Sequence, residues 1–324
     1  MASTTMGPWG LQDIPGQQGK MAVVTGATGG LGYETALGLA LAGAEVILAG
    51  RNDKKGADAL TRLRAAVPRA SARFERVDLA NLDSVHSFAD RLLKQGKPIQ
   101  ILVNNAAVMA TPSRETTANG FEMQLGTNYL GHFALTARLL PLLMARDQSR
   151  VVNLSSIAHR QGKINFDDLR SERKYDAWAA YCQSKLAMLL FALELQRRSD
   201  ANGWGLLSNA AHPGYARTDL IANGPGSASP MGWMHKSIGK LMSHSAAAGA
   251  LPILFAATAP EAKPGGYYGP NGFMEMKGHV AEAMISKSAQ DAGVARRLWG
   301  VSEKLTAVAW SKDGVGERVK VAAR

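Results

Sequence analysis

A glycine-rich turn near the start of the chain constrains its fold more than any other feature. Residues 21–25 are a short apolar run, residues 25–32 read TGATGGLG, and apolar residues at helical spacing then continue towards residue 43. Such a turn leaves no side chains where a strand passes into a helix, so a phosphate can approach backbone N–H groups and the positive end of the helix dipole. An ordinary tight turn is the alternative. We expect the pyrophosphate of a dinucleotide to contact Gly26, Thr28, Gly30, Leu31 and Gly32.

Short apolar runs and helical patterns alternate along the chain. They predict strands at 21–25, 45–49, 73–77, 99–103, 150–154 and 206–211, and helices at 54–66, 82–93, 121–144 and 178–198. Such alternation implies a parallel sheet covered by helices on both faces, with ligands bound beyond the carboxyl ends of the strands. We therefore predict an irregular lead-in over residues 1–20 and one doubly wound α/β domain, a Rossmann fold, over residues 21–324.

Composition and cysteine usage narrow the class of protein. The 324 residues are 46% hydrophobic, which suffices for a large buried core. The only cysteine, Cys182, cannot form an internal disulfide, so we expect a cytoplasmic protein in which Cys182 is a small apolar helix residue. No apolar run reaches the roughly 18 residues of a membrane span, and the start lacks a basic region followed by an apolar one. We therefore predict neither membrane insertion nor secretion.

The charge pattern argues against two further classes. The net charge is +11, but the Lys and Arg residues are scattered, and no basic run carries interleaved aromatic residues. We predict a solvated basic surface and no nucleic-acid partner, although a binder of DNA or of a membrane surface stays open as an alternative. His159 and His212 belong to no cluster with metal-ligand spacing, so we predict no metal site.

The ends of the next three predicted strands suggest how a dinucleotide is selected. The second strand ends in AGRN, and Arg51 stands where an NAD-selective protein usually presents an acid to the adenosine ribose. A guanidinium can instead pair with a 2′-phosphate, so Arg51, with Asn52 beside it and Lys55 as a weaker contact, predicts NADP(H) in preference to NAD(H). A solvated arginine is the alternative. The following two strand ends suggest an adenine pocket lined by Asp78, Leu79, Asn105, Ala106 and Ala107.

Several motifs in the same order resemble the short-chain dehydrogenase/reductase family, over most of residues 20–275. They are the glycine turn, Asp78, NNAA at 104–107, TNYLGHF at 127–133, NLSS at 153–156, Tyr181 with Lys185, and HPGYART at 212–218. Within the family the chain is most similar to the retinol dehydrogenase and WW-domain oxidoreductase branch, through NYLGHF at 128–133, SSIAH at 155–159 and AYCQSKLA at 180–187. It looks like a soluble, bacterial-type member of that branch.

The resemblance implies a catalytic group of Asn128, Ser156, Tyr181 and Lys185. It makes Tyr181 the general acid/base, and the spacing agrees, because residues four apart on a helix share a face. The charge of Lys185, with that of an oxidised nicotinamide, is expected to lower the pKa of the phenol from about 10 towards neutral pH. Ser156 is implied to hydrogen-bond the substrate oxygen, and Asn128 to belong to a backbone and water relay that feeds Lys185. Tyr181 and Lys185 would also contact the cofactor, whose nicotinamide amide the resemblance places beside Pro213, Gly214 and Thr218.

Two segments, residues 157–178 and 215–245, are expected to close over the nicotinamide, with the loop-like stretch 222–230 as a small lid. Their apolar side chains predict a pocket for a small to medium apolar substrate. The expected substrate contacts are Ser156, Trp178, Tyr215, Trp233 and Met234.

The sequence thus predicts an NADP-dependent alcohol dehydrogenase or carbonyl reductase, which interconverts a ketone or aldehyde and an alcohol by hydride transfer. A reductase of carbon–carbon double bonds and a non-catalytic NADPH-binding sensor stay open as alternatives. Ser156 favours carbonyl chemistry, and a binding-only protein has no need for the pair Tyr181 and Lys185. A monomer and a homo-oligomer are both compatible with the sequence.

Overall fold

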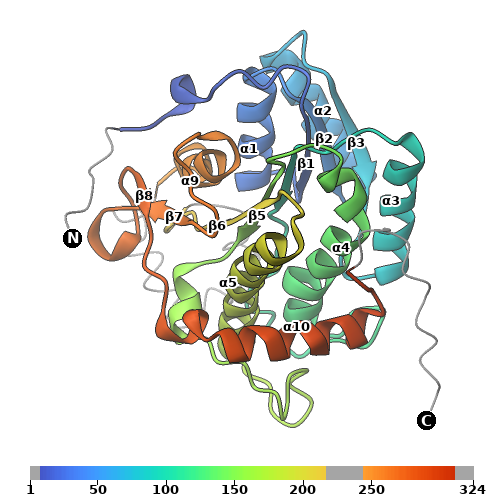
Figure 1. Cartoon of the computed structure of the whole chain (residues 1–324), viewed down its shortest axis with the longest axis vertical. Coiled ribbons are helices and arrows are strands. Elements are labelled where there is room, and N and C mark those ends of the chain that lie inside the picture. Colours follow the sequence, from blue (N-terminus) through green and yellow to red (C-terminus); the bar gives the residue numbers. More distant parts are fainter. Residues whose placement is uncertain (1–7, 217–243, 311–324) are drawn as a thin grey trace.

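One sheet forms the centre of the molecule in the computed structural model, which describes residues 8–216 and 244–310 (Figure 1). Within these residues its strand order is β3-β2-β1-β4-β5-β6-β7-β8, and only the last pair, β7 and β8, is antiparallel. The strands are β1 Met21–Thr25, β2 Glu45–Gly50, β3 Ala72–Arg76, β4 Ile101–Asn104, β5 Arg150–Leu154, β6 Leu207–Ala211, β7 Tyr267–Pro270 and β8 Val280–Glu282. The predicted doubly wound α/β domain is confirmed.

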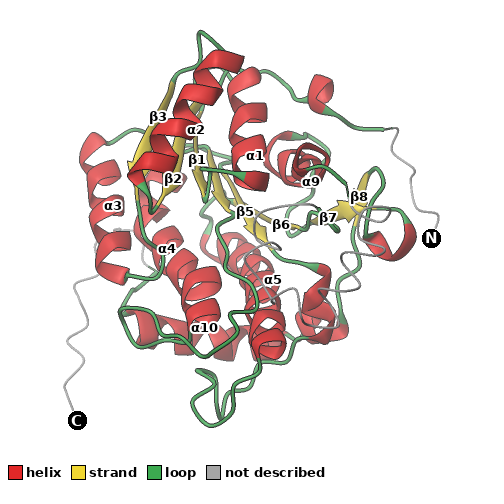
Figure 2. Cartoon of the chain, turned by 180° about the vertical axis from the view of Figure 1, so that it is seen from behind, coloured by secondary structure: helices red, strands yellow, loops and turns green. Residues whose placement is uncertain are grey.

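Helices cover both faces of this sheet (Figure 2). On one face pack α1 Gly30–Leu41, α2 Asp53–Ala66 and α9 Ala246–Thr258. On the other face pack α3 Leu82–Gln95, α4 Gly131–Met144, α5 Ala177–Asn202 and α10 Ala292–Thr306. None of the helices in the described part of the chain is long and apolar enough to cross a membrane.

Strand β1 shows why both faces need cover. Ala22 and Val24 face the core beneath α1 and α9, whereas Met21 and Val23 face the core beneath α4 and α5. Because side chains alternate between the faces of a strand, a strand buried on both sides reads as a continuous apolar run. The strand order reverses between β1 and β4, and a crevice opens at the carboxyl ends of the strands at such a point.

The structure departs from the predicted elements in two places. The predicted helix 121–144 divides into a π-helical segment, Leu125–Leu130, and α4, and the π-helical segment carries Asn128. The elements α9, β7, β8 and α10 were not predicted at all. The lead-in is attached to the domain through Trp9, whose ring packs edge-on against Phe255 of α9 with centroids 5.3 Å apart.

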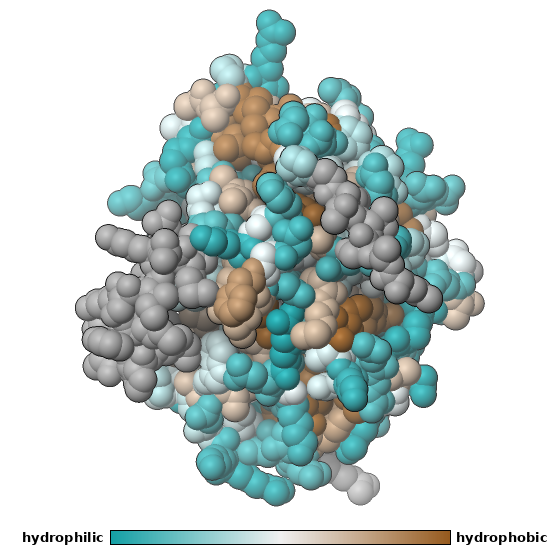
Figure 3. Space-filling model, turned by 90° about the vertical axis from the view of Figure 1, so that its left-hand side faces the viewer, coloured by the Kyte–Doolittle hydropathy of each residue, from teal (hydrophilic) through white to brown (hydrophobic). Residues whose placement is uncertain are grey.

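The outer surface agrees with the scattered charge of the sequence. In the view of Figure 3, hydrophilic side chains cover most of the face, and apolar side chains form separate patches between them. Exposed large apolar residues include Phe273, Met274 and Met284, which lie in and just after the β7–β8 hairpin.

Candidate active site

The glycine turn after β1 has the geometry that phosphate binding requires. Gly26 and Gly30 have φ of +67° and +52°, in the left-handed region that favours glycine. A Cβ on Gly32 would lie 2.4 Å from the carbonyl oxygen of Gly26 and 2.5 Å from Asn105 Nδ2. The turn therefore accepts no larger residue at position 32, and it leaves the N-terminus of α1 open to an anion.

A cavity of about 480 Å³ lies beside this turn, at the carboxyl ends of β1, β2 and β4. Its lining also includes Val108, Met109 and Thr111, which sequence reasoning missed. Asn52 is not part of the lining; its side chain accepts from the backbone N–H of Lys55 at 2.9 Å and caps α2. The predicted cofactor contacts that line the cavity are Gly26, Thr28, Gly30, Leu31, Gly32, Arg51, Asp78, Leu79, Asn105, Ala106 and Ala107. A dinucleotide therefore fits the residues present at this crevice.

A buried hydroxyl holds the two sides of the crevice together. Thr25 Oγ1 accepts from the backbone N–H groups of Asn105 and Ala106, at 2.9 and 3.0 Å, and lies 2.8 Å from His132 Nε2. The other ring nitrogen of His132 lies 2.8 Å from the carbonyl oxygen of Asn128. Because that oxygen can only accept, Nδ1 carries the proton and Nε2 accepts from Thr25. Burial lowers the pKa of His132 to about 4, which keeps this neutral arrangement.

The four predicted catalytic residues converge beyond the end of β5. Tyr181 and Lys185 lie on α5 and are 6% and 4% exposed, with Lys185 Nζ 5.7 Å from the centre of the Tyr181 ring. Ser156 follows β5, caps the short 3-10 helix Ile157–Gln161 and hydrogen-bonds the Tyr181 side chain. Asn128 lies on the π-helical segment, which contacts α5.

Burial shifts the pKa values of both Tyr181 and Lys185 in the protein without a cofactor. Burial raises the pKa of Tyr181, and the hydrogen bond with Ser156 offsets only part of that effect. Burial also lowers the pKa of Lys185 to about 8, while its Nζ donates to the carbonyl oxygen of Leu154 at 3.1 Å. Burial therefore dominates the pKa of Tyr181 when no cofactor is bound, and the expected lowering by Lys185 together with an oxidised nicotinamide stays a prediction. A phenol protonated at neutral pH can donate its proton.

The side chain of Asn128 makes hydrogen bonds through both its oxygen and its nitrogen. Its Nδ2 donates to the carbonyl oxygen of Val108 and to Ser184 Oγ, each at 2.9 Å, and its Oδ1 accepts from the N–H of Val108 at 2.8 Å. The side chain thus ties the loop after β4 to α5 and fixes the distance between the cavity wall and the catalytic pair. Its role in a relay to Lys185 stays a prediction.

The predicted substrate contacts are divided between described and undescribed residues. Trp178 stacks at a tilt beside Tyr181, with ring centroids 5.6 Å apart, and forms a small apolar cluster with Met109, Ala158 and Cys182. Cys182 is buried, and burial raises the pKa of its thiol to about 12, as befits a packing residue. Thr218, Trp233, Met234 and the segment 222–230 lie outside the described residues.

The turn after β6 places Pro213 and Gly214 near the same end of the sheet. Gly214 has φ of +65°, and a Cβ there would lie 2.3 Å from the carbonyl oxygen of Met276. The N–H of Tyr215 donates to that same oxygen at 2.7 Å. Among the described residues no group of His, Cys, Asp and Glu side chains could hold a metal ion.

Comparison with known proteins gives a consistent result. Residues 20–225 match the family described as short chain dehydrogenase. The chain is 43% identical to retinol dehydrogenase 13 of Mus musculus, over 92% of this chain and 87% of that protein, and 40% identical to polyprenol dehydrogenase of Mus musculus, over 93% and 88%. A solved structure of a protein from Mycobacterium paratuberculosis superposes with a TM-score of 0.77 at 38% identity, covering 94% of this chain and 100% of that one. A 3-oxoacyl (acyl-carrier-protein) reductase from Agrobacterium tumefaciens, solved with NADP bound, superposes with a TM-score of 0.60 at 27% identity, covering 78% and 93%.

Proposed function

The chain belongs to the short chain dehydrogenase family, and from that premise we propose that it is an NADP(H)-dependent oxidoreductase that interconverts an apolar ketone or aldehyde and its alcohol. The observation that carries the proposal is the meeting of Ser156, Tyr181 and Lys185 beyond the end of β5, in the same sheet whose β1, β2 and β4 ends border the cavity. The catalytic residues themselves lie outside the lining of that cavity. The relatives named as retinol and polyprenol dehydrogenases support chemistry on an alcohol or carbonyl group.

Each residue of the site has a chemical task in this reaction. The bound nicotinamide would supply or accept the hydride. The protonated phenol of Tyr181 donates a proton to the carbonyl oxygen as the alcohol forms, and the hydroxyl of Ser156 holds that oxygen beside the phenol. The ammonium of Lys185 lies against the face of the Tyr181 ring and stabilises the phenolate that remains.

Arg51 supports the choice of NADP(H). Arg51 and Lys55 place two positive charges on the cavity lining, and Arg51 is exposed at the end of β2 with no ion pair to another described residue. A 2′-phosphate would meet both side chains, and a guanidinium binds phosphate oxygens in a bidentate manner. The NADP bound to the reductase from Agrobacterium tumefaciens is consistent with this preference.

The apolar character of the substrate is inferred from the neighbours of Tyr181. Trp178 lies beside its ring, and Met109 packs against the small cluster that contains Tyr181 and also lines the cavity. Apolar walls with a few polar groups are typical of sites that bind lipophilic ligands. The names of the retinol and polyprenol dehydrogenases point to apolar alcohols of the same kind.

The test combines cofactor binding with turnover. We expect the purified protein to bind NADPH at least about tenfold more tightly than NADH, and to oxidise NADPH with members of a panel of apolar ketones and aldehydes. Tyr181→Phe keeps the ring but removes the proton, so kcat should fall by about 10²–10⁴ while NADPH binding is retained. Tyr129→Phe is the matched control, because it removes a buried hydroxyl that bonds Ser302 at 2.7 Å, on the side of α10. Unchanged turnover in Tyr181→Phe, or no binding of either cofactor by the wild type, would contradict the proposal.

A further inference from the structure

A carboxylate from the β7–β8 hairpin accepts hydrogen bonds from two side chains distant in sequence and from one nearby backbone N–H group. Glu275 ends the 3-10 helix Phe273–Glu275. Its Oε2 accepts from His212 Nε2 at 2.9 Å and from the guanidinium of Arg160, and its Oε1 accepts from the backbone N–H of Met284 at 3.0 Å. The two side-chain partners are 63 and 115 residues away in sequence, so the fold alone brings them together.

His212 transmits this contact to the turn after β6. Its side chain is fully buried, and its Nδ1 accepts from the N–H of Gly214 at 3.2 Å while its Nε2 faces Glu275. The carboxylate therefore selects the tautomer and the orientation of the ring. A Cβ on Gly269 would lie 2.0 Å from His212 Nε2, so the ring also has no room to shift towards β7.

Arg160 connects the same carboxylate to the catalytic segment. It lies on the 3-10 helix that Ser156 caps. The adjacent His159 is fully buried, and its Nδ1 lies 2.6 Å from the carbonyl oxygen of Ser156. Glu275 is thus linked to Ser156 through Arg160 and its neighbour His159. It is linked to Gly214 through His212.

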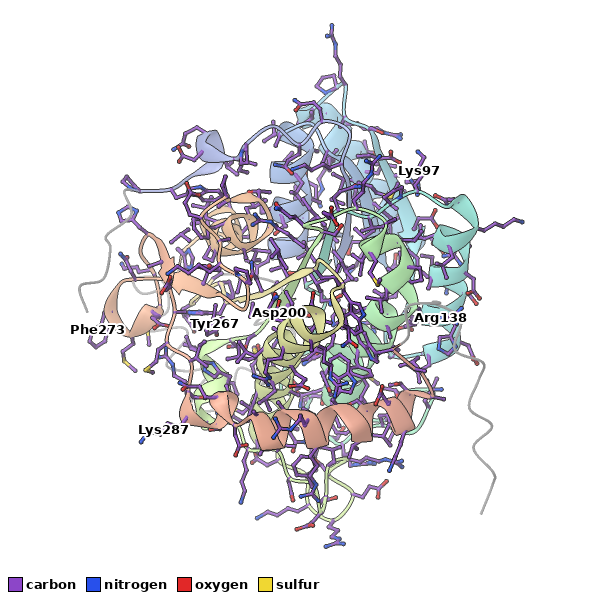
Figure 4. All side chains as sticks on the ribbon, viewed as in Figure 1. Lys97, Arg138, Asp200, Tyr267, Phe273 and Lys287 are labelled. Carbon is purple, nitrogen blue, oxygen red and sulfur yellow. The ribbon has the colours of Figure 1, made fainter. Side chains whose placement is uncertain are left out.

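The backbone conformation around Glu275 indicates that its hydrogen bonds and ion pair determine the local structure. Met274 and Glu275 are non-glycine residues with φ of +51° and +58°, a conformation that persists when surrounding contacts impose it. In the same short helix Phe273 is 74% exposed, whereas the Glu275 side chain is 19% exposed in its pair with Arg160. Figure 4 shows Phe273 at the outer edge of the hairpin and Tyr267 further inside the molecule. The charged residue is turned inward and the aromatic one outward, the reverse of what packing alone favours.

We propose that Glu275 is a positioning residue, which holds the turn at 212–214 in register with Ser156 so that the turn can receive the nicotinamide end of the cofactor. This inference rests on the proposed function. It predicts that Glu275 governs binding of the nicotinamide half of the dinucleotide and leaves the half held by the glycine turn unaffected. Glu275 contacts the turn after β6 through His212 and the segment after β5 through Arg160, and it is not among the residues that line the cavity beside the glycine turn.

The test is Glu275→Gln, with two ligands compared. An amide replaces one accepting oxygen by a donor, so it cannot accept from His212, Arg160 and Met284 together. We expect the Kd for NADPH to rise about tenfold, because bonds to a charged acceptor are lost. The Kd for 2′-phospho-ADP-ribose, which lacks the nicotinamide, should stay within about twofold of wild type. With a carbonyl substrate, kcat should fall by about 10- to 100-fold, as expected when reacting groups are misplaced.

Two further variants separate positioning from folding. Glu282→Gln, on the same hairpin, removes a carboxylate paired with Lys263 where both side chains are more than half exposed, and it should behave as wild type in all three measurements. Arg160→Lys keeps the charge but not the planar fork, and it should shift NADPH binding in the same direction by a smaller factor, even where Glu275→Gln folds poorly.

Each outcome decides the inference. Selective loss of NADPH affinity in Glu275→Gln or in Arg160→Lys supports it. Equal weakening of both ligands, or wild-type binding and kcat in both variants, overturns the inference and leaves the proposed function standing. A wild-type protein that binds 2′-phospho-ADP-ribose but neither NADPH nor NADH would overturn the proposed function and the inference with it.

Discussion

Two turns at the same edge of the sheet are stabilised by different kinds of contact. The turn after β1 holds its shape through left-handed glycines and backbone groups, with Thr25 Oγ1 and Asn105 Nδ2 as its neighbours. The turn after β6 also contains a left-handed glycine, Gly214, but it is held in addition by His212 and, through it, by the charged pair Arg160 and Glu275. A turn that receives a pyrophosphate needs bare N–H groups and close approach, whereas one that bounds a flat ring needs exact placement by side chains. The comparison implies that substitutions at the two turns change cofactor binding differently. Those at the first turn should weaken binding of any dinucleotide or its adenosine half, and those at the second only binding of the nicotinamide half.

Among substitutions at the two turns, Gly32→Ala should have the largest effect on cofactor affinity. The new Cβ would meet the Gly26 carbonyl oxygen at 2.4 Å and the side-chain amide of Asn105 at 2.5 Å, and the Gly26 backbone cannot shift cheaply. We expect affinity to fall at least about a hundredfold for NADPH and for 2′-phospho-ADP-ribose alike, as overpacking closes the phosphate site. Isothermal titration of both ligands measures this directly.

Gly300→Ala is the matched control for that substitution. Gly300 lies in α10, and a Cβ there meets nothing within 4 Å. Alanine should leave binding unchanged and raise helix stability by about 0.5–1 kcal/mol. If Gly32→Ala spared the fragment and weakened only the whole dinucleotide, the contrast between the two turns would fail.

The part of the fold that the sequence predicted has a clear physical basis. Strands 21–25 and 150–154 are found with the predicted bounds, because short runs rich in apolar residues next to turns identify strands buried on both faces. The region after residue 244 escaped prediction. The β7 sequence YYGP contains glycine and proline, β8 has three residues, and α9 is apolar all round, so no periodicity distinguishes them.

The residues of the candidate site likewise divide into those that belong to local sequence patterns and those that act through distant contacts. The glycine turn and the pair Tyr181 and Lys185 are local patterns, so the resemblance to the family identified them, and the spacing of the pair agrees. His132 and Glu275 act on residues more than 60 positions away, and no local pattern marks such contacts. The burial that raises the pKa of Tyr181 was not foreseen for a related reason, since it depends on the packing of α5 against segments distant in sequence.

A smaller effect should appear in the pH dependence of stability at the first turn. His132 has a pKa of about 4 in the folded protein against 6.5 as the ordinary value, because burial disfavours its charged form. The unfolded chain therefore binds the additional proton first as the pH falls. The neutral His132 therefore contributes roughly 3 kcal/mol to the free energy of unfolding. This contribution is present in full above pH 6.5 and is lost progressively as the pH falls towards 4.

His132→Gln isolates that contribution. A glutamine can donate to Asn128 and accept from Thr25 but does not titrate between pH 4 and 7. Urea unfolding at several pH values should show a shallower loss of stability in the variant than in the wild type. Identical slopes in the two proteins would show that His132 does not titrate as its burial implies. The dependence would then come from His159, His212 and His244, whose pKa values burial also lowers.

The smallest expected effect concerns Arg51, at the rim of the first turn. The glycines serve any dinucleotide, so discrimination between cofactors must come from side chains on the lining, and Arg51 is the exposed guanidinium among them. Arg51→Gln should raise the Kd for NADPH about tenfold and leave that for NADH unchanged, since only the 2′-phosphate is lost as a partner. Lys54→Gln removes an equal charge three residues away without touching the cavity, and it should change neither value beyond the weak, salt-screened attraction of a distant charge. Equal effects of the two substitutions would mean that the turn attracts phosphate by overall charge, and the preference for NADP(H) would then have no dedicated side chain.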